Sequence, residues 1–376
     1  MSTVNEAGGR GPAEFERVLP GDQHSVASFE EDRPSALRRV QHFLHAYPTT
    51  VPFIVLLLGV FLFSLIVGPK FFAPFNLSLV LQQVTIIGIL GIAQTLIILT
   101  AGIDLSVGVI MILCSVVMGR TAVVYGVPLE IAFPLGFLCG LACGFVNGAI
   151  VTFLRLPPFI VTLGTWSIFG ALNIFYSRSE TIRQKEIEDH APFLQWPGTA
   201  IRPYDLLSDH LGIVLPWLKG SVITMGSVIM ILIAIAVWFL LQRTAFGRHV
   251  YATGDDPEAA RLAGINTTRT LAIVYALAGF ICAIAAWILI GRIGSISPQS
   301  GLTANLDSIT AVVIGGTSLF GGRGAIAGTL MGALIVGVFR NGLSLAGLDV
   351  LWQEFAIGLL IIFAVGLDQW IRRISA

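Results

Sequence analysis

The stretch LVLQQVTIIGILGIAQTLIILTAGIDLSVGVIMILCSVVM, residues 79–118, consists of two apolar runs separated by a short interruption. A helix that crosses a bilayer needs about 20 mainly apolar residues, so this stretch predicts two spans, 79–100 and 105–125. The interruption contains Asp104, and no basic residue lies within fifteen positions of it on either side. Glycines flank this carboxylate. The pattern indicates a helix end or re-entrant turn, whose backbone must be buried in protein or face water.

The rest of the chain repeats this apolar pattern. Of its 376 residues, 55% are hydrophobic and 12% are charged, whereas a soluble domain carries about 25% charged residues. The composition excludes an ordinary soluble domain and indicates an all-α, polytopic transmembrane helical bundle of about ten spans. The predicted spans are residues 51–68, 79–100, 105–125, 130–153, 158–177, 221–241, 270–290, 308–322, 324–345 and 353–371.

Basic residues predict the orientation, because short cytoplasmic connections carry an excess of Lys and Arg. With the N-terminus inside, most arginines beside short connections fall on the cytoplasmic side. We therefore expect both termini in the cytoplasm, a loop at 178–220 on the outer face and a loop at 242–269 on the cytoplasmic face. Residues 1–50 are polar and lack the apolar segment of a signal peptide, so we expect a disordered cytoplasmic tail before the membrane domain 51–376.

Two Asn-Gly pairs indicate an internal repeat. The pair at 147–148 is followed 16 residues later by Gly164, and the pair at 341–342 is followed by Gly358 at the same interval. The copies lie 194 residues apart and, on the ten-span count, cross the membrane in opposite senses. Five helices repeated with inverted topology is a common transporter plan, with chance matches among the glycines as the alternative.

A second glycine pattern has a four-residue spacing. On a helix this spacing forms a smooth ridge that a neighbouring backbone approaches closely, so we expect helix packing here rather than ligand binding. The glycines of the ridge are Gly136, Gly140, Gly144 and Gly148.

Polar side chains occur inside or close to the predicted spans. They should face the bundle interior or a pathway, because exposure to lipid is costly. Amides and hydroxyls suit a sugar, although hydrogen bonding between helices explains each residue equally well. For Asp104 the sequence favours a cap on the following helix over contact with a passing solute. The pathway candidates are Asp104, Asn147, Thr165, Asn305, Asp307 and Asn341.

The segment DDPEAARLAG, residues 255–264, predicts a short helix within the loop 242–269. Pro257 suits a first helical turn, the acidic residues suit a helix N-terminus, and Gly264 suits a helix end. A short helix without a core of its own is expected to dock into a partner's groove; a passive connection is the alternative. The candidate docking residues are Gly254, Asp255, Glu258, Ala259, Ala260 and Gly264.

Several function classes lack support in the sequence. No lysine completes a GxxxxGK[ST] phosphate loop, so we do not expect this chain to hydrolyse ATP. The six histidines lie in tails and loops without a catalytic constellation, and the four cysteines favour packing over metal binding. The 22 basic and 22 acidic residues balance, which gives no net field for nucleic acid.

Glu258-Ala259-Ala260 followed by Gly264 resembles the EAAxxxG coupling loop of ABC importer permeases. Four longer stretches resemble permease subunits of ribose- and xylose-type sugar importers. Within that group, FNLSLVLQQVTIIGILG (75–91) and LPPFIVTLGTWSIFGALNIFYS (156–177) are most similar to the fructose-import permeases of alpha-proteobacteria. The resemblance covers about residues 50–376, and it departs after Gly264, where the usual proline-containing continuation is absent. The four stretches are AGIDLSVG (101–108), PPFIVTLGT (157–165), FGRHVYATGDDPEAARLAGI (246–265) and NLDSITAVVIGGTSLFGGRGAIAGTLMGALIVG (305–337).

The resemblance implies a transport subunit in the bacterial inner membrane that performs no covalent chemistry. It implies a second permease subunit, expected as a homodimer, and two copies or two domains of an ATP-binding subunit, which would hold ATP and magnesium and dock on the loop 242–269. A periplasmic sugar-binding protein would deliver a monosaccharide on the side of loop 178–220, with fructose suspected and ribose, mannose or xylose as alternatives. No cofactor or metal is expected in this chain, and the remaining partner is membrane lipid.

Two other functions stay open at the level of sequence. An ion-coupled secondary transporter of a small polar solute would use carboxylates in the membrane, for which Asp104, Asp307, Asp349 and Asp368 are candidates. That function leaves the EAAxxxG loop unexplained. A sugar exporter with the same fold would differ in its partner proteins rather than in this chain.

Overall fold

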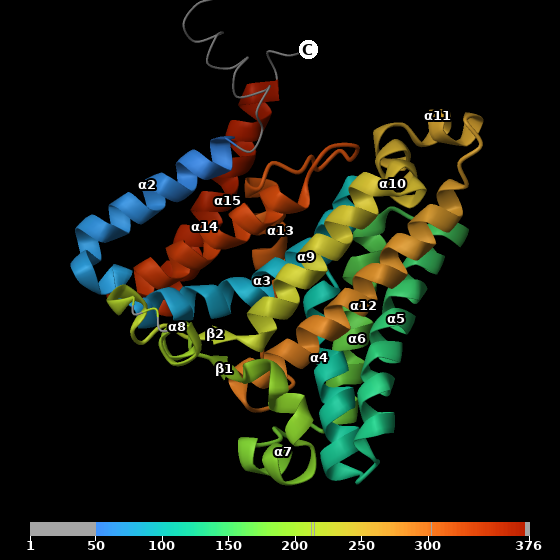
Figure 1. Cartoon of the computed structure of the whole chain (residues 1–376). Helices are drawn as coiled ribbons and strands as arrows, with labels where there is room; N and C mark the ends of the chain where they lie inside the picture. Colours follow the sequence, from blue (N-terminus) through green and yellow to red (C-terminus); the bar gives the residue numbers. More distant parts are fainter. Residues whose placement is uncertain (1–49, 212, 214, 302, 373–376) are drawn as a thin grey trace, which may run out of the picture. The chain divides into compact units, whose positions relative to one another are not determined.

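The computed structural model of the chain describes residues 50–372, apart from positions 212, 214 and 302. The tail predicted at 1–50 lies outside the described residues except for its last position. The described chain forms a bundle of helices (Figure 1), which confirms the all-α fold class. Its main helices are α2 (Thr50–Val67), α3 (Pro74–Leu99), α4 (Val107–Gly119), α5 (Leu129–Phe153), α6 (Pro158–Ser177), α9 (Met225–Arg243), α12 (Thr267–Ile293), α13 (Ala304–Ile314), α14 (Ile326–Leu345) and α15 (Val350–Arg372).

Among the described residues, eight helices are long and apolar enough to cross a membrane. The predicted span 308–322 is wrong, because α13 has 11 residues and ends at Ile314. The sequence GGTSLFGGRG follows it, and each glycine in a helix interior costs about 1 kcal/mol relative to alanine. The described apolar part of α15, Val350–Leu360, is also shorter than a span, although the helix itself continues to Arg372. The chain is therefore a polytopic bundle of eight long apolar helices, the half-length helix α13, and α15.

Glycines bring α5 and α12 into close contact. An added Cβ on Gly140 would lie 2.5 Å from the Gly279 carbonyl oxygen, and one on Gly144 would overlap the Tyr275 carbonyl. The other two glycines of the ridge also lie against neighbouring helices. Because Gly140, Gly144 and Gly148 contact backbone atoms, no larger residue fits at these three positions without moving a helix, whereas Gly136 contacts a side chain. The outer two contacts are Gly136 with Met118 of α4 and Gly148 with Ala272 of α12.

The helices recur along the chain at nearly the predicted interval. Helices α3 and α6 begin at residues 74 and 158, and α12 and α15 begin at residues 267 and 350. The contacts between helices show the same repeat: α3 packs on α13 and α14, and α12 packs on α4 and α5. The first helix of each half is thus held by the second and third helices of the other half, which supports an internal repeat.

The two long connections lie at opposite ends of the bundle (Figure 1). The connection 178–220 is folded rather than a simple loop, and we call its side the α7 end. The connection 242–269 contains two helices instead of the one predicted, and we call its side the α11 end. The elements at the α7 end are α7 (Gln184–His190), a 3-10 turn (Pro192–Gly198), α8 (Pro203–Leu211) and an antiparallel pair, β1 (Ala200–Ile201) with β2 (Ile223–Thr224); those at the α11 end are α10 (Ala245–Asp255) and α11 (Pro257–Leu262).

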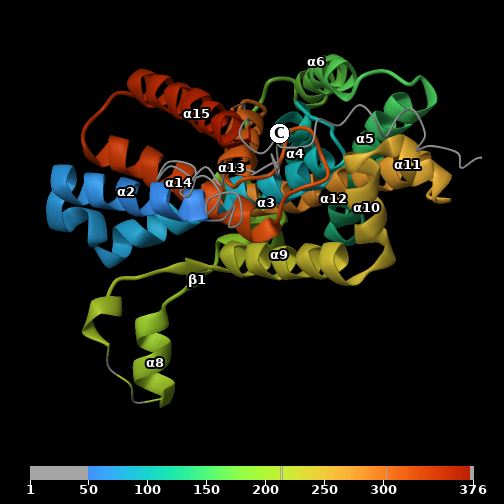
Figure 2. The same cartoon turned by 90° about the horizontal axis from the view of Figure 1, so that it is seen from above.

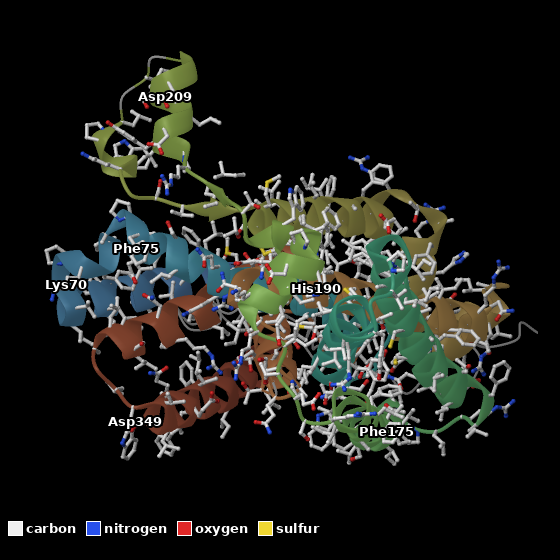
Figure 3. The ribbon with its side chains drawn as sticks, turned by 90° about the horizontal axis from the view of Figure 1, so that it is seen from below. Lys70, Phe75, Phe175, His190, Asp209 and Asp349 are labelled. Atoms are coloured by element: carbon white, nitrogen blue, oxygen red, sulfur yellow. The ribbon has the colours of Figure 1, made fainter. Side chains whose placement is uncertain are left out.

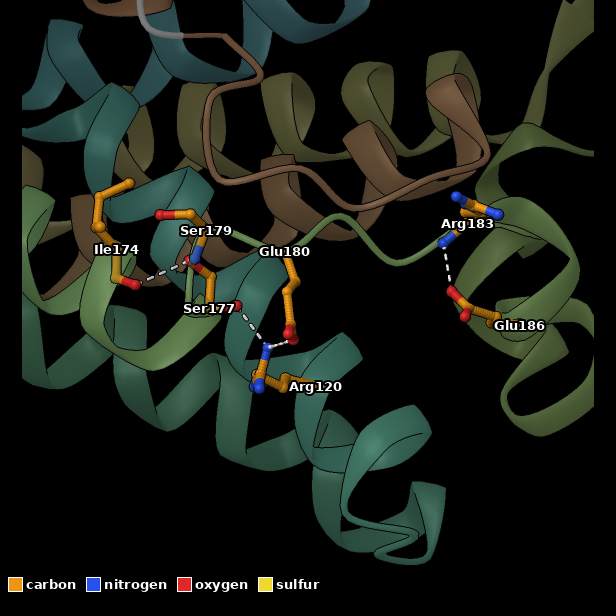
Figure 4. A network of polar contacts seen from close by, with 7 residues as sticks. All are labelled: Arg120, Ile174, Ser177, Ser179, Glu180, Arg183 and Glu186. Carbon is orange, nitrogen blue, oxygen red and sulfur yellow. Dashed lines mark hydrogen bonds and ion pairs between the residues drawn. The ribbon is translucent and has the colours of Figure 1, made fainter.

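A buried arginine fixes the α7 end. Arg120 follows α4 and is 3% exposed. Its Nη1 donates to the carbonyl of Ser177, the last residue of α6, and to Glu180 Oε2 at 2.9 Å (Figure 4). Nearby, the backbone N–H of Arg183 donates to Glu186 Oε2 at 2.7 Å and caps α7. These bonds hold the ends of α4 and α6 together.

Candidate functional site

Residues 100–106, between α3 and α4, leave the helical conformation around Asp104. The Asp104 side chain is 2% exposed. Its Oδ1 accepts hydrogen bonds from the N–H and the hydroxyl of Ser106, both at 2.6 Å, and Oδ2 accepts one from Asn147 Nδ2 at 3.3 Å. The carboxylate therefore holds the backbone of Ser106, directly before Val107 where α4 begins, but it does not bond the first N–H groups of the helix itself, which have no side-chain cap.

Three further helices hold this loop through polar side chains. On α6, the Thr162 hydroxyl donates to the Ile103 carbonyl at 3.0 Å and accepts from the Leu105 N–H at 3.2 Å. On α13, Asn305 Nδ2 donates to the Leu105 carbonyl at 3.1 Å. On α3, the Gln94 carboxamide, oriented to match, pairs with the N–H and the carbonyl of the aspartate, both at 3.1 Å. With Asn147 on α5, four helices fix the loop.

The loop lies where two interrupted helices meet. Helix α4 begins at Val107 and α13 begins at Ala304, and an added Cβ on Gly108 would lie 3.1 Å from the backbone nitrogen of Asn305. Residues 294–301 lead toward this point from the α7 end, where Ile296 pairs with Ile182. In many transporters, solute sites are built where the N-termini of such discontinuous helices meet. We call this meeting point the junction.

One side of the junction is exposed in the single chain. Gln299, Gly301 and Thr303 are exposed, and Leu306 is 53% exposed. Helices α6 and α15 lie on this same side of the bundle (Figure 2), and Figure 3 shows Phe175 of α6 and Asp349 beside α15 on one side as well. Within the hydrocarbon region of a bilayer, non-helical backbone does not face lipid. We call this exposed surface the junction face.

An ion-pair triad lies beside the junction and contains two residues that the sequence analysis did not select. Arg340 Nη2 of α14 donates to Asp307 Oδ1 of α13 at 2.8 Å and to Glu354 Oε1 of α15 at 3.0 Å. The side chains of Asp307, Arg340 and Glu354 are 11%, 21% and 42% exposed. Arg340 and Glu354 are ionisable residues inside predicted spans, and that property alone makes a residue a functional candidate.

The remaining two pathway candidates lie away from the junction loop. Asn341 and Asn76 exchange two amide hydrogen bonds, at 2.9 and 3.0 Å, and both are 5% exposed, so they join α14 to the start of α3. The Thr165 hydroxyl donates to the Thr162 carbonyl within α6 at 3.3 Å. The structure thus gathers Asp104, Asn147 and Asn305 at the junction and gives Asn341 and Thr165 bonds between or within helices.

The predicted helix in the segment 255–264 is present as α11. Asp256 Oδ1 accepts from the N–H groups of Glu258 and Ala259 at 2.9 and 3.0 Å, which caps the helix, and Gly264 ends it with a φ of +84°. Ala260 is 4% exposed and faces the bundle, whereas the side chains of Glu258 and Leu262 project outward. The Leu262 side chain is 91% exposed.

A contact between backbones joins the α11 end to the junction. Gly254, next to the last residue of α10, lies against the Leu99 carbonyl, which also accepts from the Gly322 N–H at 3.0 Å; an added Cβ on Gly254 would overlap that carbonyl. The Tyr251 hydroxyl donates to the Gly324 carbonyl at 2.9 Å. Burial raises the pKa of Tyr251, which keeps this donor protonated. Residue 99 leads into the Asp104 loop, so α10 contacts the chain directly before that loop.

A polar hollow of about 640 Å³ opens at the α7 end. The end of α12 and the 3-10 turn line it, with Arg292, Gln195 and Trp196 among the lining residues. Among the described residues, Arg292 forms no ion pair. The hollow therefore presents an unpaired cation beside an aromatic ring on the surface opposite α11.

Comparison with known proteins gives one family and several relatives. Residues 76–365 match the family described as branched-chain amino acid transport system / permease component. The chain is 53% identical to the fructose import permease protein FrcC of Rhizobium meliloti, over 96% of this chain and 97% of the relative. It is 38% identical to the ribose import permease protein RbsC of Bacillus subtilis, over 87% and 95%.

The similarity extends to a further sugar system. The chain is 34% identical to the xylose transport system permease protein XylH of Escherichia coli, over 80% of this chain and 86% of the relative. No solved structure matches the chain.

Proposed function

Since the chain belongs to the family of branched-chain amino acid transport system permease components, we propose that it is the permease subunit of a bacterial ATP-binding-cassette importer that carries a monosaccharide across the inner membrane. The observation that carries this proposal is the 53% identity, over nearly both full lengths, to a protein named as a fructose import permease. Fructose is therefore the first candidate substrate. The similarity to ribose and xylose permeases leaves the ion-coupled alternative without support.

The exposed α11 helix supports docking of a partner that hydrolyses ATP. The projecting Glu258 and Leu262 side chains offer one charged and one apolar contact. Two ATP-binding subunits or domains, which hold ATP and magnesium, would press on the α11 helices of two permease copies. Their movement would pass through the contact of Gly254 with Leu99 to the Asp104 loop. The α11 end is then cytoplasmic.

The junction face supports assembly with a second copy of the chain. The exposed non-helical residues Gln299, Gly301 and Thr303 need a water-filled or protein environment within a membrane, and a second copy facing them would enclose a pathway between the two junctions. The polar hollow at Arg292 lies at the opposite end from α11, where a periplasmic sugar-binding protein would release its sugar. We therefore place the pathway along the junction face of a homodimer.

Uptake in living cells tests the substrate. Cells that lack the gene are expected to lose uptake of labelled fructose and to regain it with the restored gene, while ribose and xylose uptake serve as comparisons. Recovery of ribose or xylose uptake alone would replace fructose as the substrate. No change for any of the three sugars would contradict the proposed function.

Substitution of the projecting residues on α11 tests the docking role. We expect Glu258→Ala with Leu262→Ala to lower uptake about tenfold or more, because loss of an interface contact of a few kcal/mol changes binding by at least that factor. Both side chains are exposed, so the variant should insert and fold normally. The measurement is co-purification of the ATP-binding subunit and ATP-driven uptake in vesicles. Wild-type values for both would show that α11 is a passive connection.

A further inference from the structure

The Asp307–Arg340–Glu354 triad lies on the junction face. Asp307 follows the exposed Leu306 in the first turn of α13, and Glu354 lies on α15, which packs beside α13. The Glu354 side chain is 42% exposed. Charged side chains in membrane-spanning segments almost always face the bundle interior or a water-filled cavity, so we expect the open side of the triad to face a cavity rather than lipid.

The three side chains keep free hydrogen-bonding atoms after their mutual ion pairs form. Arg340 uses only Nη2 for both carboxylates, and its buried Nε has no partner among the described residues. Nη1 of Arg340, Oδ2 of Asp307 and Oε2 of Glu354 are also without a protein partner in that part of the chain. The triad therefore offers strong donors and strong acceptors side by side.

This combination matches a polyhydroxylated solute. Each sugar hydroxyl both donates and accepts, and hydrogen bonds to ionised groups are roughly twice as strong as those between neutral groups. Two carboxylates and one guanidinium leave the triad with a formal net charge of −1, which disfavours anions such as sugar phosphates.

We propose that the Asp307–Arg340–Glu354 triad is a sugar-contact site on the translocation pathway, selective for neutral monosaccharides. The inference rests on the proposed function. It adds Arg340 of α14 and Glu354 of α15 to the pathway residues proposed at the junction. Arg340 positions the two carboxylates, and Glu354, the most exposed member, makes the first contact with the solute.

Conservative substitution separates sugar contact from a structural role. Glu354→Gln keeps the size of the side chain and a hydrogen bond acceptor but removes the charge. We expect fructose uptake in vesicles, with the ATP-binding subunit and a saturating sugar-binding protein, to fall about three- to tenfold, the size of one hydrogen bond, with unchanged thermal unfolding. The matched control is Asp349→Asn, an exposed acid that caps the start of α15 outside the triad, which should leave uptake unchanged.

Chemical labelling adds a readout that does not depend on transport. Glu354→Cys should react with a charged, membrane-impermeant thiol reagent, and fructose-loaded binding protein with ATP should slow the reaction compared with the sugar-free protein. Leu359→Cys, an exposed apolar position on another face of the same helix, should stay unreactive. The wild-type chain, whose cysteines are buried or half-buried, gives the background.

The outcomes separate the two proposals. If wild-type vesicles take up no sugar, the proposed function fails, whatever the variants do. If the wild type transports fructose but Glu354→Gln does too at the same rate, the triad is not a contact site. Parallel loss of uptake and thermal stability, or labelling at position 354 that is absent or insensitive to fructose, would likewise assign the triad a purely structural role.

Discussion

Gly254→Ala will abolish sugar uptake. The glycine lies against the Leu99 carbonyl and near the Gly322 backbone nitrogen, and an added Cβ overlaps the first and comes within 2.8 Å of the second. Both neighbours are backbone atoms, so α10 must move away from the end of α3. Overpacking of this kind costs about 1–3 kcal/mol, and here the displacement breaks the link between the docking helix and the junction. We expect uptake below about one tenth of the wild-type value.

The measurement is ATP-driven uptake in vesicles together with ATP hydrolysis by the assembled complex. Because α11 remains exposed, the ATP-binding subunit should still co-purify and hydrolyse ATP without transport. Gly170→Ala is the control, since an added Cβ at that position meets no atom within 4 Å and should leave uptake intact. Normal transport by Gly254→Ala would disprove the mechanical link.

Asp104→Ala will destabilise the folded protein strongly. The change leaves two buried donors without an acceptor, the N–H and the hydroxyl of Ser106, whereas Nδ2 of Asn147 loses one bond and keeps its bond to the Ser106 hydroxyl oxygen. Each unsatisfied buried group costs about 1–3 kcal/mol, so we expect the free energy of unfolding to fall by about 2 kcal/mol or more. Thermal unfolding of the purified protein measures this loss.

Asp104→Asn distinguishes the structural cap from contact with a solute. Its Oδ1 can still accept both bonds from Ser106, whereas its amide nitrogen faces the donor of Asn147. We therefore expect a smaller loss of stability, about 1 kcal/mol. Uptake should fall only in proportion to the loss of folded protein. A variant that is stable but inactive would instead place the Asp104 carboxylate in contact with the sugar.

The sequence predicted the spans correctly where apolar runs were long and uninterrupted. The predicted span 308–322 was too long, because a short apolar run also fits a helix of half the span length. Hydropathy alone does not show that the chain leaves the helix after Ile314, where the glycines of 315–324 begin. Helix α11 was predictable, since Pro257 and Gly264 are local signals for its start and end. Helix α10 before it was not predicted, although Thr244 caps its start by accepting from the Gly247 N–H.

The functional candidates divide in the same way. Asp104 stood out as a lone acid in an apolar stretch, and its bond to Ser106 is local enough to expect from the sequence. Asp307 was selected as a polar residue in a predicted span. Its ion pair with Arg340, 33 residues away, was not predicted, and neither was the ion pair of Arg340 with Glu354. Nothing in the spacing of these residues indicates that three different helices bring them together.

The sequence by itself determined that this chain is a helical membrane protein with a short helix beginning at Pro257, because membrane insertion depends on apolar length and helix ends depend on neighbouring residues. Only the tertiary structure decided that α4 and α13 begin at the same place, that Gly254 touches the start of the Asp104 loop, and that one arginine joins two acids. These arrangements depend on how closely helices pack across the bundle. Backbone approach and ion pairing are set by distance in space, which the order of residues along the chain does not specify.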